Sequence, residues 1–148
     1  MSRCCLVILV GVVIVTSLLT SCRTVEAVTD FDDLIDRLHQ AGAVVEITSH
    51  TVRNLHLSVN GMVIVIGGEN LQVFEYEDVA QAHLEFKALV GSSPGLVFFH
   101  EGEPPVTEIV PLNRGCYHSG RFVLLYDGEN EAALKALRTA VGRPSAPR

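Results

Sequence analysis

A thiol and two imidazoles in the C-terminal half of the chain are the residues best suited to chemistry. Cys116 precedes His118 by two residues, so an extended backbone would place both side chains on one face. A cysteine nucleophile needs a base within hydrogen-bond reach and a third group that orients the base. No local signature supplies that third group, whether His118 or His100 is the base. We assign no catalytic residue, predict that the protein is not an enzyme, and keep a Cys116/His118 enzyme as an alternative.

The same three residues are the best candidates for a metal site. A metal site built from Cys116, His118 and His100 needs all three ligands to converge, and nothing in their spacing indicates convergence. An acidic group at 32–36 lacks the glycine and the terminal glutamate of an EF-hand loop, so we interpret it as a solvated helix face. We therefore predict no metal and no cofactor.

Cys22 is the other candidate for chemistry, because it ends a long apolar run. Residues 4–21 carry no ionisable group except thiols, and a single positive charge, Arg3, precedes them. A charged start, an apolar stretch and small residues before a processing point are typical of a secretory signal. A run of this length can also just cross a bilayer. An uncleaved single-span membrane protein and a plainly secreted one therefore stay open as alternatives.

The end of this run, Leu19-Thr20-Ser21-Cys22, resembles the lipobox of bacterial lipoprotein signal peptides. The resemblance implies that the sulfur of Cys22 receives a diacylglyceryl group and that the bond between Ser21 and Cys22 is cut. Two or more acyl chains, at about 0.8 kcal/mol per buried methylene, anchor a protein stably. The resemblance thus implies an exported lipoprotein on the cell membrane. Arg23, in place of an aspartate, favours the outer membrane in a diderm cell.

The chain divides into four segments, and the part after the apolar run is acidic. We take residues 1–21 as the signal peptide, 22–28 as a mobile tether, 29–143 as a single domain and 144–148 as a frayed tail. The part from Cys22 onward has ten Lys and Arg against seventeen Asp and Glu, a formal charge of −7. This balance excludes a nucleic-acid partner and adhesion to anionic lipids. Cys116 has no second free cysteine for an intramolecular disulfide.

Apolar periodicity predicts three helices. Their apolar faces lie within Phe31–Leu38, Val79–Val90 and Ala133–Val141. Asp78 and Gln81 have the spacing of a capping box at the start of the second helix.

Alternation and short apolar runs predict the strands. These are Ala43–Ile47, an edge strand or an extended loop at 55–59, Met62–Ile66, Leu71–Tyr76, Leu96–Phe99, Val106–Val110 and Arg121–Tyr126. Whether both Leu96–Phe99 and Val106–Val110 are strands stays open. Thr48–Asn54 and Pro111–Ser119 are predicted as irregular segments. Gly67-Gly68 joins two strands and is therefore a hairpin turn and not a phosphate-binding loop.

This order predicts an α+β fold. Pairs of strands flanked by helices, in the order αββαββα, favour one antiparallel sheet of four to six strands with its helices packed on one face. The arrangement would be close to a permuted ferredoxin-like fold.

Three segments of the domain resemble a group of small exported bacterial proteins of uncharacterised function. They are Phe31–Gly42, Gln72–Asp78 and Tyr117–Gly128. The resemblance implies a small α+β domain behind a signal or lipoprotein sequence, and it implies no activity. The segment 96–115 fits less well, and Cys116 stands where the group has an aromatic residue.

Tyr117, Arg121 and Tyr126 form a possible partner surface around the Ser119-Gly120 turn. Tyrosine and arginine are enriched in binding hot spots, although such residues also cover sheet edges. Together, these features predict a lipid-anchored, non-catalytic binding or structural module of the cell envelope. Its contacts would be the membrane, through the lipid, and an unidentified protein.

Overall fold

The computed structural model describes residues 25–54, 56–91, 96–100, 106–108 and 115–145. The signal peptide, Ser21 and the lipid acceptor Cys22 lie outside these residues. The elements are α2 (Phe31–Gln40), β1 (Val45–Asn54), β2 (Asn60–Ile66), β3 (Glu69–Glu75), α3 (Val79–Gly91), β4 (Leu96–His100), β5 (Val106–Glu108), β6 (Cys116–Ser119), β7 (Phe122–Tyr126) and α4 (Glu131–Val141).

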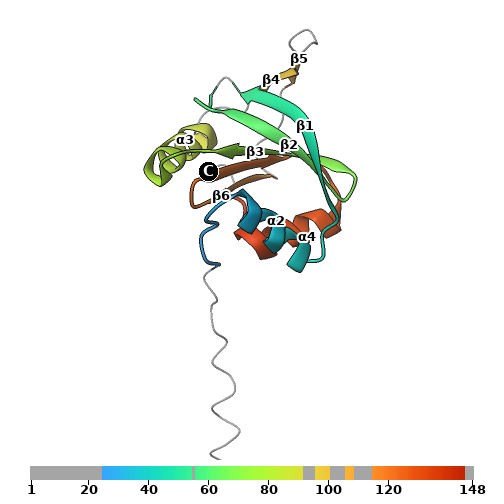
Figure 1. Cartoon of the computed structure of the whole chain (residues 1–148). Helices are drawn as coiled ribbons and strands as arrows, with labels where there is room; N and C mark the ends of the chain where they lie inside the picture. The colour runs from blue at the N-terminus through green and yellow to red at the C-terminus, as the bar shows by residue number, and fades with distance from the viewer. Residues whose placement is uncertain (1–24, 55, 92–95, 101–105, 109–114, 146–148) are drawn as a thin grey trace, which may run out of the picture.

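The strands form one sheet with the order β5-β4-β1-β2-β3-β7-β6, and all neighbouring pairs are antiparallel. Figure 1 shows this curved sheet above α2 and α4, with α3 at its side. The predicted α+β class, with an antiparallel sheet and helices packed on it, is confirmed. The sheet has seven strands among the described residues, more than the four to six predicted. Both Leu96–His100 and Val106–Glu108 are strands.

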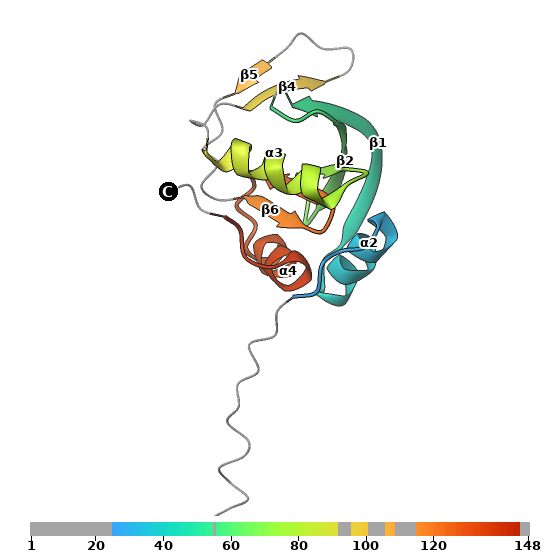
Figure 2. The ribbon, with the colours of Figure 1, turned by 90° about the vertical axis from the view of Figure 1, so that its left-hand side faces the viewer.

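The helices cover both faces of the sheet, so the prediction of a single helical face is wrong. Leu34 of α2 and Leu137 of α4 pack in one apolar cluster, whereas Phe86 of α3 packs in a second cluster. Figure 2 shows α3 in front of the sheet and apart from α2 and α4. The structure therefore departs from a permuted ferredoxin-like arrangement. The physical reason is that β3 and β7 carry apolar side chains on both faces, and both faces must be covered.

The largest error in the strand predictions concerns β1, which extends well beyond the predicted strand Ala43–Ile47. Its pairing with β2 shifts register between Ile47 and Thr51, where the hydroxyl of Thr48 donates to the carbonyl oxygen of Val63 at 2.5 Å. The polar run Thr48–Asn54, predicted as a loop, is thus an irregular strand that bends within the sheet. Of the two alternatives for 55–59, an edge strand or an extended loop, the second holds for residues 56–59, which connect β1 to β2.

Glycines with positive φ allow two tight hairpins. Gly67 (φ 60°) and Gly68 (φ 87°) separate the paired residues Ile66 and Glu69, which confirms the predicted turn. Gly120 (φ 58°) lies in the turn between β6 and β7. The prediction that Pro111–Ser119 is irregular is therefore wrong for its last four residues, which form β6.

The helices begin at capping side chains. The carboxylate of Asp30 accepts the N–H of Asp33 at 2.8 Å, and the amide oxygen of Asn130 caps α4. Asp78 accepts the N–H of Ala80 at 3.0 Å, but Gln81 points to other partners, so the predicted capping box is incomplete.

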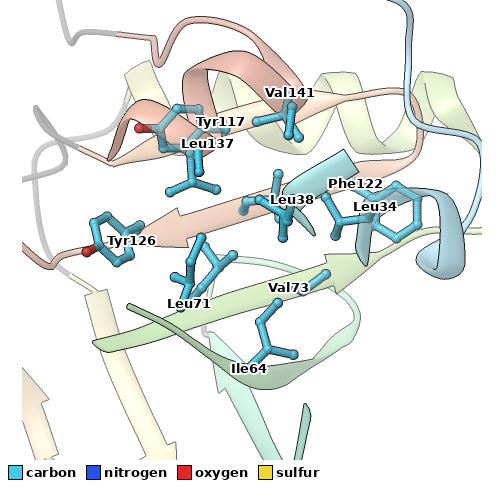
Figure 3. Packing of buried hydrophobic residues seen from close by; sticks show 14 of the residues in the cluster. Leu34, Leu38, Ile64, Leu71, Val73, Tyr117, Phe122, Tyr126, Leu137 and Val141 are labelled. Carbon is cyan, nitrogen blue, oxygen red and sulfur yellow. The ribbon is translucent and has the colours of Figure 1, made fainter. Parts of the chain in front are cut away.

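Two apolar clusters form the core. Figure 3 shows the larger one, in which side chains of α2 and α4 meet those of β2, β3, β6 and β7. All five residues of β7 are buried, because this strand lies between β3 and β6 with apolar clusters on both faces. The core fixes β6 and β7, and thereby the positions of the candidate site residues.

Candidate functional site

The prediction that Tyr117 and Tyr126 belong to a partner surface is wrong. Tyr117 is 0% exposed and Tyr126 is 2% exposed, and both pack in the cluster beneath α2 and α4. Arg121 is partly exposed, forms an ion pair with Glu75 at 2.6 Å and stacks over the ring of Phe122. The strand alternation turns the tyrosine rings inward, because this face of β6 and β7 is covered by helices.

Cys116 and His118 share one face of β6, as the two-residue spacing predicts, and both lie beneath α3. The thiol of Cys116 is 1% exposed, and burial raises its pKa to about 12. The nucleophilic form of cysteine is the thiolate, so at neutral pH this side chain is an inert thiol. The side chain of His100 lies outside the described residues. The burial of Cys116 argues against the alternative hypothesis of a Cys116/His118 enzyme.

His118 makes two ring contacts with α3. Its ring centroid lies 5.2 Å from that of Phe86, nearly parallel to it, and 5.3 Å from that of His83. Burial, followed by the nearby His83, lowers the pKa of His118 below its usual value. Sequence analysis missed this pair, because a separation of 35 positions carries no local signal. Among the described residues, no group of three or more His, Cys, Asp and Glu side chains could hold a metal ion.

Glu85 of α3 joins the helix to the loop before β2. Its carboxylate accepts the N–H and the hydroxyl of Ser58 at 2.8 and 2.6 Å, and the hydroxyl of Tyr76 at 2.8 Å. Gln81 donates to both Ser58 and Glu85. Burial raises the pKa of Glu85, but the hydrogen bonds together outweigh it and hold the pKa below its ordinary value. Hydrogen bonds connect these four side chains into one group, centred on Glu85, so we interpret it as a structural clamp.

A second carboxylate, Glu69, holds the start of α4. It accepts the hydroxyl of Tyr126 and the backbone N–H of Asn130, the latter at 3.0 Å. The side chain of Asn130 donates in turn to the carbonyl oxygen of Gly67 at 2.9 Å. The hydrogen bond from Tyr126 is the main cause of a lowered pKa at Glu69. These bonds fix the β2–β3 hairpin against α4.

The N-terminal segment is bound to the domain, which corrects the prediction of a mobile tether at 22–28 for its last residues. Val28 is buried and donates its N–H to the hydroxyl oxygen of Ser119 at 3.0 Å. Arg37 donates to the carbonyl oxygens of Glu26 and Ala27 while it pairs with Asp33 at 2.8 Å. The structured domain therefore begins before residue 29.

An open recess lies beside this segment. Its volume is about 330 Å³, and its lining residues are Val25, Arg37, Gln40, Ala41, Thr139 and Ala140. The lining mixes polar and apolar groups from the segment, α2 and α4. Arg37, its charged residue, is already engaged by Asp33, so the recess has no free charge to bind a ligand.

Exposed apolar side chains lie at the start of β1 and just before it. Val44 is 81% exposed and Ile47 is 57% exposed. In the described part of the chain, β1 pairs with β4 only at Val52–Asn54, so the outer edge of Val45–Ile47 has no strand beside it. Unpaired strand edges are common places for a protein to add a strand from a partner.

No helix within the described residues is long and apolar enough to cross a membrane. Comparisons with models of known protein families, with curated proteins and with solved structures found no match to this chain. The resemblance of the domain to small exported bacterial proteins stays a prediction.

Proposed function

We propose that the protein is a lipid-anchored, non-catalytic binding module of the cell envelope. The observation that carries the proposal is the sequence Leu19-Thr20-Ser21-Cys22 shortly before a folded domain. A lipid on Cys22 would attach this domain to the outer surface of a membrane, with the outer membrane favoured in a diderm cell.

The bound N-terminal segment supports this proposal. Because Glu26, Ala27 and Val28 are held by Arg37 and Ser119, only a few residues separate Cys22 from the domain. An extended chain covers about 3.3–3.6 Å per residue, so the lipid would hold the domain close to the bilayer. Such a short attachment suits a module that acts at the membrane and does not search far from it.

The chemistry of the described side chains also supports binding over catalysis. Cys116 is buried and protonated, and the carboxylates of Glu69 and Glu85 are used to join elements of the fold. The exposed apolar surface formed by Ile47 of β1 and by Val44 just before this strand is the described surface that best suits an extended segment of a protein partner.

Metabolic labelling with palmitate in a bacterial host that processes lipoproteins tests the anchor. We expect the full chain to be labelled and to enter the membrane fraction, and the Cys22→Ala variant to lose the label. The matched control is Cys5→Ala, which removes a cysteine of the leader and should leave the label in place. Labelling that persists in Cys22→Ala would refute the proposal.

Mass spectrometry of the mature N-terminus separates the remaining alternatives. A first residue of Cys22 with added acyl mass agrees with the lipoprotein. A chain that still begins at Met1 would instead show an uncleaved single-span protein. An unmodified N-terminus after cleavage would show plain secretion.

A further inference from the structure

The imidazoles of His83 and His118 meet where α3 packs against β6, and neither belongs to the proposed anchor. Their ring centroids are 5.3 Å apart and their planes are inclined by 53°. His83 is exposed, and His118 is partly buried. The pair therefore combines one ring held in the fold with one ring open to solvent.

The Nε2 atom of His118 is buried and has no hydrogen-bond partner in the described part of the chain. A buried polar atom without a partner costs about 1–3 kcal/mol, and a bound ion or water is one recognised explanation. Simple ring packing accounts for the contact with Phe86 but leaves this nitrogen unexplained.

The backbone of Gly120 orients the ring of His118. A hydrogen bond joins this ring to the backbone of Gly120. Because Nε2 has no partner, the nitrogen engaged by Gly120 is Nδ1. A metal-binding histidine typically donates its other ring N–H to a backbone carbonyl or a carboxylate, which orients the ring.

The separation of the rings fits a shared ion. Zn–N bonds of about 2.0–2.1 Å at a tetrahedral angle place the centroids of two coordinating imidazoles about 5 Å apart. The observed separation is 5.3 Å. The exposed His83 makes no hydrogen bond through its ring among the described residues, so it can rotate to direct a nitrogen at the ion.

We propose that His83 and His118 together bind a divalent transition-metal ion, such as Zn²⁺ or Ni²⁺, and that the ion links α3 to β6. Imidazole ligands suit these metals and not Mg²⁺ or Ca²⁺. No third protein ligand lies with the pair in the described residues, so water completes the coordination.

Thermal unfolding tests this site. The purified, untagged full chain in detergent is first treated with a chelator, and its unfolding is then measured with and without added metal ions. Binding to the folded state raises the unfolding midpoint. At Ni²⁺ or Zn²⁺ concentrations well above the dissociation constant, we expect a rise of about 5 °C, reversed by the chelator. Mg²⁺ should give no rise.

Two variants and one control make the test specific. His83→Ala removes the exposed ligand, and His118→Phe keeps a ring against Phe86 but removes the lone pair; both should abolish the rise. His50→Ala removes an exposed histidine of β1 and should retain it. The absence of a rise in the unaltered chain, or an equal rise in His83→Ala, would overturn the proposal.

Discussion

Val28 donates its backbone N–H to the hydroxyl oxygen of Ser119 at 3.0 Å, across 91 positions of sequence. This bond joins the N-terminal segment to the end of β6. Replacing Ser119 with alanine leaves the buried N–H of Val28 without its acceptor, so we expect a loss of about 1–2 kcal/mol of unfolding free energy. Urea unfolding measures the loss, and faster hydrogen exchange at the Val28 amide locates it.

Ser49→Ala is the control for this variant, because Ser49 is an exposed serine in the irregular part of β1. We expect it to change the stability by less than about 0.5 kcal/mol. Equal stability of Ser119→Ala and the unaltered chain would show that the segment is held by other contacts.

Gly61 lies directly beneath the ring of Phe74. The two residues pair across β2 and β3, and a Cβ on Gly61 would come within 2.7 Å of the Phe74 ring. Gly61→Ala should therefore force the ring to move and destabilise the protein by about 1–3 kcal/mol. Gly91→Ala, where no atom lies within 4 Å of the new Cβ, is the matched control. Comparable denaturant midpoints for the two variants would contradict the expected overlap.

Glu85 makes stability depend on pH in the acidic range. Because its pKa is lowered in the folded protein, its contribution is present above the unfolded pKa, about 4.3, and is lost as the pH falls through the folded value. Glu85→Gln should lower the unfolding free energy at pH 7 by about 1–2 kcal/mol and flatten the acid side of the profile. Denaturant titrations across this pH range measure both effects.

The control for Glu85 is Glu46→Gln, which neutralises an exposed carboxylate of β1. Its profile should parallel that of the unaltered chain. If the unfolding free energy of Glu85→Gln falls with decreasing pH as steeply as that of the unaltered chain, other carboxylates set the pH dependence.

Cys116 should be almost unreactive in the folded state. Its pKa is raised to about 12, against about 8.5 for a free cysteine. At pH 8 we expect alkylation slower than that of the unfolded chain by a factor on the order of 10²–10³. Iodoacetamide labelling, followed by mass spectrometry of the peptide containing Cys116, compares native and urea-unfolded protein. Rapid labelling of the native protein would reopen the hypothesis of a cysteine-dependent enzyme.

Local patterns were sufficient for most elements of the fold. Helical spacing located α2 and α4, and alternation predicted the strand Leu71–Tyr76, in which Leu71 and Val73 lie in one apolar cluster and Phe74 in the other. The same patterns failed at Thr48–Asn54, where polar side chains belong to a strand with an irregular register. A hydrophobic pattern identifies strands that bury a face, and much of β1 buries little.

The candidate site was less predictable than the fold. The shared face of Cys116 and His118 follows from strand geometry, but the burial of Cys116 beneath α3 does not. The approach of His83 to His118 likewise requires α3 to pack on the face of the sheet opposite α2 and α4. Neither relation has a signal within a single element.

The amino-acid sequence alone determined the periodic elements, the acidic charge and the lipobox resemblance at Cys22, because each depends on neighbouring residues. Only the tertiary structure decided that Tyr117 and Tyr126 point into the core, that Val28 binds Ser119 and that two imidazoles meet at α3. The physical reason is that alternation specifies which side chains share a face. Which face is then covered, and by which helix, depends on burying apolar surface across the whole chain.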